Sequence, residues 1–151
     1  MALRAISEFA LRPRAAGFLL LQWLGRRSDA IVAAMRLLGT CRDAGDVSVL
    51  DFSGEITLGE GSATLRKMVR ELVDGGKLKI LLNLAEVQYI DSAGVGELVN
   101  TYTTVRGAGG ELKIANLTKR VHDVIQITRL YTIFDVQPDE RSALNKFRAT
   151  P

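Results

Sequence analysis

Residues 78–84 read Leu-Lys-Ile-Leu-Leu-Asn-Leu, and this nearly unbroken apolar run limits the possible folds more than any other feature. A strand this apolar must be covered on both faces, as central strands of parallel sheets are. The segment before it, 63–73, places apolar side chains at helical spacing and charged ones on the opposite side. Gly75 and Gly76 separate the two. An amphipathic helix next to a fully buried strand predicts an α/β fold.

The same alternation continues along the chain and predicts a single α/β domain over residues 35–151. Its central sheet should be mixed but largely parallel, with right-handed crossover connections and with helices packed against it. Gly54 is expected to end the first strand, Thr118 to cap one helix, and Pro138 to lie in the first turn of the last. The expected strands are 47–52, 78–84, 112–115 and 132–136, and the expected helices are 63–73, one after Asp91 that ends at 107–110, 119–127 and 139–147.

Residues 1–34 differ from the rest in being rich in arginine and poor in acids. The apolar stretch 15–24 is too short to span a bilayer, which takes about 20 residues of helix, and no convincing signal-peptide cleavage site follows it. We expect a helical extension outside the core. It is interpreted as a loosely attached amphipathic helix or as the product of an upstream start codon, with Met35 as the native start; Pro13 should break any helix here.

Charge and cysteine content exclude several classes of function. The formal net charge is +3, but the first 34 residues hold five arginines against Glu8 and Asp29, so the remaining chain is neutral overall. We therefore expect no nucleic-acid partner, because a phosphate-binding surface needs a basic stripe. Cys41 is the only cysteine and cannot form an intramolecular disulfide, which fits a cytoplasmic protein. We also expect no membrane partner.

The residues offer no catalytic or metal-binding set. His122 is the sole histidine, and Ile90 occupies the first glycine position of a serine-hydrolase elbow around Ser92. Val99 breaks the dinucleotide fingerprint after Gly94-Val95-Gly96, and the segment 54–62 lacks the end of a P-loop. One Cys and one His with scattered carboxylates form no ligand set. We expect no catalytic residue, no cofactor and no metal.

Ser92 is the candidate working residue, since it lies where a buried strand passes into a helix. Its hydroxyl could simply cap a backbone N–H in the first turn. Two features favour a function instead. Gly94 and Gly96 weaken the first turns of the helix, as expected if a partner approaches the backbone. The carboxyl ends of strands carry the functional loops of open α/β sheets, so Ser92 should be reachable.

The segment 46–147 resembles the STAS domains, in particular the anti-sigma factor antagonists of bacterial partner-switching systems. The shared features are Gly54-Glu55-Ile56-Thr57, the apolar strand 80–84, Asp91-Ser92-Ala93-Gly94-Val95-Gly96, Gly110 before 112–115, and the helix 121–128.

This resemblance implies that Ser92 is phosphorylated and that a docking surface surrounds it. The implied partner is an anti-sigma factor with a kinase-like ATP fold, and a serine phosphatase resets the switch. Phosphorylation would add about −1.5 to −2 charges and disrupt a packed interface. Thr57 stands where much of the family has Asp, a difference that bears on the efficiency of phosphorylation or on the partner's identity. The implied docking residues are Glu55, Thr57, Asp91, Ser92, Ala93, Gly94, Val95 and Gly96.

Two other functions remain open from the sequence. A STAS subunit of a membrane lipid or anion transporter would give the basic segment 1–34 a purpose. A nucleotide-binding or small-ligand-binding regulatory module would use the loop at Gly59 or at Gly94.

Overall fold

The computed structural model describes residues 36–149, which contain one five-stranded sheet in the order β1-β2-β3-β4-β5. β1 pairs antiparallel with β2, and all other neighbours are parallel. This confirms the expected α/β domain with a mixed, largely parallel sheet. The prediction for residues 1–34 lies outside the described residues. The strands are β1 (Leu38–Ala44), β2 (Val47–Ile56), β3 (Lys79–Ile90), β4 (Glu111–Ala115) and β5 (Asp135–Gln137).

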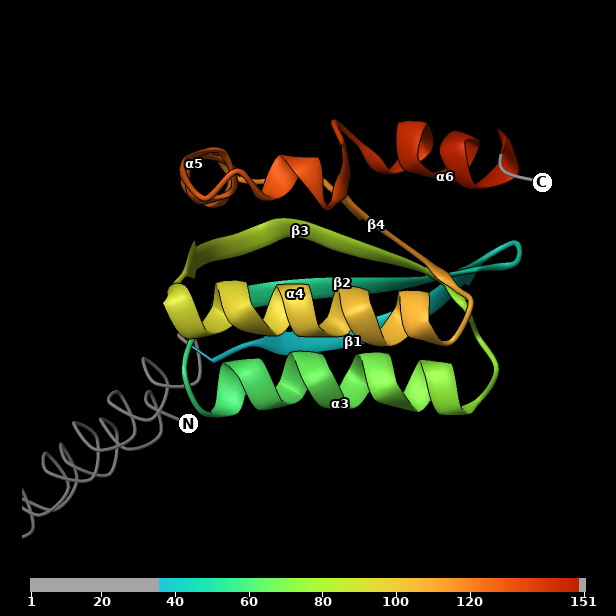
Figure 1. The fold of residues 1–151 in the computed structure, drawn as a ribbon, viewed down its shortest axis with the longest axis horizontal. Coiled ribbons are helices and arrows are strands. Elements are labelled where there is room, and N and C mark those ends of the chain that lie inside the picture. Colours follow the sequence, from blue (N-terminus) through green and yellow to red (C-terminus); the bar gives the residue numbers. More distant parts are fainter. Residues whose placement is uncertain (1–35, 150–151) are drawn as a thin grey trace, which may run out of the picture. The chain divides into compact units, whose positions relative to one another are not determined.

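Within residues 36–149, four α-helices cover the sheet (Figure 1). Two of them, α3 and α4, run side by side along one face, while α5 and α6 lie on the other side of β3 in this view. The α5 helix has the bounds that the sequence predicts. The helices are α3 (Glu60–Asp74), α4 (Ser92–Gly107), α5 (Lys119–Ile127) and α6 (Glu140–Ala149).

Side chains of β3 alternate between two hydrophobic clusters. Ile80 and Leu82 belong to the large cluster that α3 and α4 complete, whereas Leu81 belongs to a smaller one with Phe147 of α6. All four side chains are buried. The run is apolar throughout because consecutive residues of a strand face opposite sides, and both sides of β3 are covered.

The first strands differ from the prediction in two ways. β1 was not predicted, because its sequence is mostly polar and its side chains are largely exposed, as an edge strand allows. The prediction that Gly54 ends the next strand was wrong, since β2 continues to Ile56. Gly54 has a φ of 108°, and a Cβ there would overlap the carbonyl oxygen of Arg36. Gly54 therefore leaves room for the backbone of Arg36, and it does not end the strand.

The last third of the chain departs from the prediction at one strand. A 3₁₀ turn, η2 (Leu130–Thr132), occupies the start of the predicted strand 132–136. The strand that forms, β5, is shorter than predicted and begins only at Asp135. Arg129 adopts a left-handed φ of 57°, so the chain turns directly after α5 and enters the sheet late. Pro138 precedes the first turn of α6 instead of lying in it.

The predicted position of Thr118 at the start of α5 is confirmed, but its side chain does not cap the helix. Thr118 is the N-cap of α5, but its hydroxyl donates to the carbonyl of Val87 at 2.8 Å and ties the helix to β3. Asp139, just before α6, accepts a hydrogen bond from the Ser142 N–H at 2.7 Å. That bond holds the pKa of Asp139 below its usual range.

Candidate functional site

Ser92 is the first residue of α4 and is exposed to solvent. β2 and β3 are parallel and end together, with Ile56 paired to Ile90. The loop that follows β2 therefore meets the start of α4 at one edge of the sheet. The sequence prediction that Ser92 would be reachable is confirmed.

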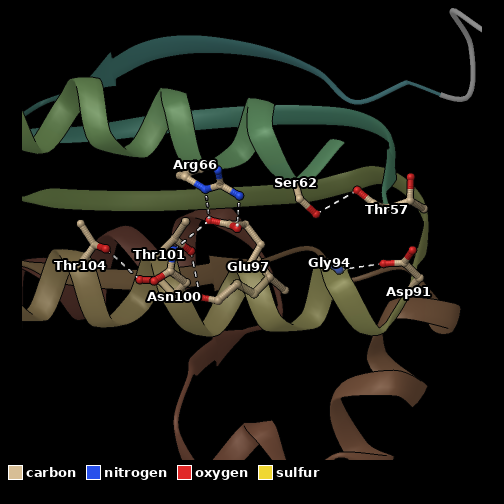
Figure 2. Close-up of polar contacts among 10 residues, drawn as sticks. Thr57, Ser62, Arg66, Asp91, Gly94, Glu97, Asn100, Thr101 and Thr104 are labelled. Atoms are coloured by element: carbon tan, nitrogen blue, oxygen red, sulfur yellow. Dashed lines mark hydrogen bonds and ion pairs between the residues drawn. The ribbon is translucent and has the colours of Figure 1, made fainter. Parts of the chain in front are cut away.

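Asp91, not Ser92, caps α4. Its Oδ1 accepts the Gly94 N–H at 2.7 Å, and its Oδ2 accepts the Leu58 N–H at 3.0 Å (Figure 2 shows the bond to Gly94). The Asp91 N–H in turn donates to the carbonyl of Ile56 at 3.2 Å. One carboxylate thus satisfies a free N–H at the helix end and fixes the loop after β2.

The capping role considered for the Ser92 hydroxyl is therefore wrong. Within residues 36–149 that hydroxyl makes no hydrogen bond. An exposed hydroxyl beside a helix N-terminus remains available to another molecule, and the helix dipole there favours added negative charge.

The two glycines that follow Ser92 serve different purposes. Gly94 is buried, and a Cβ on it would overlap the carbonyl oxygen of Ile56. Gly96 is exposed, and a Cβ there would meet nothing within 4 Å. Gly94 is needed because α4 packs against the end of β2, and not because a partner approaches. The interpretation that a glycine here lets a partner approach the backbone can therefore apply only to Gly96.

The loop between β2 and α3 is held by its own hydrogen bonds. Ser62 donates to the carbonyl of Thr57 from both its N–H, at 3.0 Å, and its hydroxyl, at 2.9 Å, the contact drawn in Figure 2. The Ala63 N–H donates to the Gly59 carbonyl at 3.0 Å. Leu58, at the middle of this loop, is 80% exposed. The backbone is fixed while this side chain stays in solvent.

An ion pair joins α3 to α4 beyond the first turns (Figure 2). Arg66 donates to both carboxylate oxygens of Glu97, at 2.9 and 3.2 Å, and Asn100 donates to the same group at 3.1 Å. The Glu97 side chain is only 8% exposed. The Arg66 guanidinium holds the pKa of Glu97 below its usual range, although burial opposes this shift. The sequence analysis missed this pair, since no local pattern links two residues so far apart in the chain.

The structure brings some of the predicted docking residues together. The N–H of Leu58, the residue after Thr57, donates a hydrogen bond to Asp91 and so holds Thr57 near it. The Gly94 N–H donates to the same carboxylate. Val95 packs partly against the large hydrophobic cluster, so it contributes to the core as well. Glu55 lies farther back in β2, in register with Tyr89 of β3. Ala93, which lies between Ser92 and Gly94 in the sequence, is half-buried.

The remaining candidates for chemistry lie apart from Ser92 in the sequence and form no set. His122 is exposed on α5, 3.8 Å from Asp123 and 3.5 Å from Gln126. In the described part of the chain no three His, Cys, Asp or Glu residues are grouped to hold a metal ion. Among the same residues, no helix combines the length and apolarity needed to cross a membrane.

Comparison with known proteins identifies the family. The STAS domain model matches residues 41–143, which is most of the chain and includes the whole Ser92 site. This chain belongs to the STAS domain family. The anti-sigma-B factor antagonist of Bacillus subtilis is 35% identical over 91 residues, which cover 60% of this chain and 81% of that protein.

Solved structures share the fold at lower identity. The Bacillus protein SpoIIAA, solved in its phosphorylated form, is 17% identical with a TM-score of 0.57, covering 73% of this chain and 99% of that one. The murine anion transporter Slc26a9 is 12% identical with a TM-score of 0.70, covering 88% of this chain but 26% of the transporter. At these identities both likenesses establish the fold alone.

Proposed function

We propose that this chain is an anti-sigma factor antagonist whose docking is switched by phosphorylation of Ser92. The observation that carries the proposal is the free, exposed hydroxyl of Ser92 at the start of α4, with Asp91 taking over the cap. The similarity to the anti-sigma-B factor antagonist of Bacillus subtilis supports the class of partner.

A kinase needs a serine hydroxyl that can enter its active site without first breaking bonds in its own protein. Ser92 meets this condition, because Asp91 alone bonds the N–H groups of Gly94 and Leu58. Phosphorylation would leave that cap in place. The fold should therefore survive modification.

The added charge acts on the interface instead. A phosphate brings about −1.5 to −2 charges beside the carboxylate of Asp91, and the N-terminus of α4 offsets part of this repulsion. A partner surface packed against the same edge would have to desolvate both anions. Docking should weaken while the antagonist itself stays folded.

The partner in this proposal is an anti-sigma factor with a kinase-like ATP fold, which releases its sigma factor when this chain docks. ATP and its metal ion belong to that partner's active site, and a serine phosphatase removes the phosphate. This chain acts as a substrate and a binding protein, without catalysis of its own. Thr57, which stands beside the site where much of the family has Asp, bears on how efficiently Ser92 is phosphorylated or on which partner is bound.

The test combines phosphorylation with binding. Purified chain is incubated with ATP and the kinase-type anti-sigma factors encoded in the same genome, and wild type is compared with Ser92→Ala and Ser92→Asp by intact mass and calorimetry. We expect one phosphate on wild type and none on either variant. Ser92→Ala should bind like wild type, and Ser92→Asp about tenfold or more weakly, since like charges oppose docking.

Thr103→Ala supplies the control, because Thr103 is an exposed hydroxyl residue on the same helix whose oxygen is bonded to the Val99 carbonyl. It should be phosphorylated and bind as wild type does. Phosphate on another residue, or equal binding by Ser92→Ala and Ser92→Asp, would refute the switch.

A further inference from the structure

Leu58 presents a large apolar side chain to solvent at the edge that carries Ser92. Its exposed fraction is 80%, whereas Ile56, two residues earlier, is fully buried. Single exposed leucines are common on protein surfaces and need no explanation by themselves. The setting of Leu58 is what distinguishes it.

The backbone on either side of Leu58 is fixed. Its own N–H is bonded to Asp91, the preceding carbonyl accepts two hydrogen bonds from Ser62, and the Gly59 carbonyl accepts one from Ala63. Gly59 has a φ of 93°, a conformation that favours glycine. Binding through a held loop avoids most of the entropy cost of ordering the chain.

Leu58 and Ser92 are also joined through a single group. The Asp91 carboxylate accepts the Leu58 N–H on one oxygen and the Gly94 N–H on the other. A molecule that covers the start of α4 would therefore meet this loop as well. The loop residues Thr57, Leu58 and Gly59 carry no charge, and Leu58 is the one large apolar side chain among them.

Resting on the function proposed above, we propose that Leu58 is the apolar anchor of the docking surface and a determinant of which anti-sigma factor is bound. The fitting partner has an apolar pocket beside the active site that receives Ser92. Side chains buried at the centre of interfaces carry most of the binding free energy, and the fixed backbone places this one in advance.

The test removes the side chain without disturbing the fold. Leu58→Ala is compared with wild type in calorimetric titrations of the full chain into the anti-sigma factor that binds wild type. We expect binding to weaken about 10-fold to 100-fold, the effect of withdrawing one leucine from a buried contact. The melting temperature should stay unchanged, because Leu58 has few contacts to lose.

Ile127→Ala is the matched control. Ile127 is 82% exposed at the end of α5, and it should leave binding unchanged. If Leu58→Ala and Ile127→Ala bind equally while Ser92→Asp is weakened, the role of Leu58 is refuted and the switch stands. If wild type binds no kinase-type anti-sigma factor, the proposed function itself fails. Self-association in sedimentation that Leu58→Ala abolishes would instead assign the surface to a second copy and overturn this inference.

Discussion

Two groups of glycines, one at each end of the sheet, are needed for different physical reasons. At the carboxyl end, where Ser92 lies, Gly94 and Gly61 have no room for a side chain, and a Cβ on Gly61 would lie 2.7 Å from the Glu55 carbonyl oxygen. In the turns at the amino end, Gly45, Gly76 and Gly109 have open space around them but φ values of 66°, 77° and 83°. Backbone contact selects the first group, and turn conformation selects the second.

Charged groups differ between the same two ends. At the amino end, exposed acids pair with lysines, as in Lys79 with Asp46 at 2.7 Å and Lys77 with Asp43 at 3.3 Å. At the carboxyl end, Asp91 binds backbone N–H groups while Ser92 and Leu58 stay open to solvent. A fixed backbone with exposed side chains is suited to recognition, and the carboxyl end combines the two at Leu58 and Ser92.

The largest effect is expected from Gly94→Ala. The new Cβ would overlap the Ile56 carbonyl oxygen, so α4 would have to move away from β2. Such overpacking should lower the free energy of unfolding by about 3 kcal/mol, measured by urea denaturation. Gly96→Ala, two residues on and in open space, should instead raise it by up to ~1 kcal/mol, because alanine is the better helix former. Similar stabilities for the two variants would show that packing does not select Gly94.

A smaller effect is expected from Asp91→Ala, which removes the acceptor for two backbone N–H groups. Loss of an N-cap costs about 1–2 kcal/mol, and the Leu58 and Gly94 amides should exchange faster with solvent. Thermal unfolding and hydrogen exchange measure both. Asp46→Asn, the acid of an exposed pair at the amino end, should change stability much less. Unchanged exchange at Leu58 in Asp91→Ala would mean that the carboxylate does not hold the loop.

Local patterns were enough for much of this fold. Helical periodicity predicted α5 with its bounds, and the apolar run at 78–84 predicted a strand covered on both faces. β1 escaped prediction because an exposed edge strand needs no apolar alternation. The turn η2 escaped because a left-handed Arg129 has no signal in composition or spacing.

The site was predicted less completely than the fold. Ser92 was correctly predicted to be reachable, but the sequence analysis considered only its hydroxyl as a cap, whereas the adjacent Asp91 accepts the Gly94 N–H. The bonds from Asp91 to Leu58 and from Glu97 to Arg66 each span more than 30 residues. Such contacts depend on how β2 and β3 align, which only the folded sheet determines.

The smallest effect concerns acid stability, and it compares a buried acid with an exposed one. Hydrogen bonds from Arg66 lower the pKa of the nearly buried Glu97, and those from Lys79 lower the pKa of Asp46, whose side chain is 70% exposed. A folded-state pKa below the unfolded value gives stability that is complete above the unfolded pKa of about 4 and is lost as pH falls through the folded one.

Glu97→Gln should therefore be less stable than wild type at neutral pH, and the two should converge as the pH is lowered below about 4 in thermal unfolding. Asp46→Asn should follow the wild-type curve more closely, because solvent screens its pair. A larger change in acid sensitivity for Asp46→Asn than for Glu97→Gln would contradict the contrast. It would place the stronger ion pair in the turns at the amino end instead of between α3 and α4.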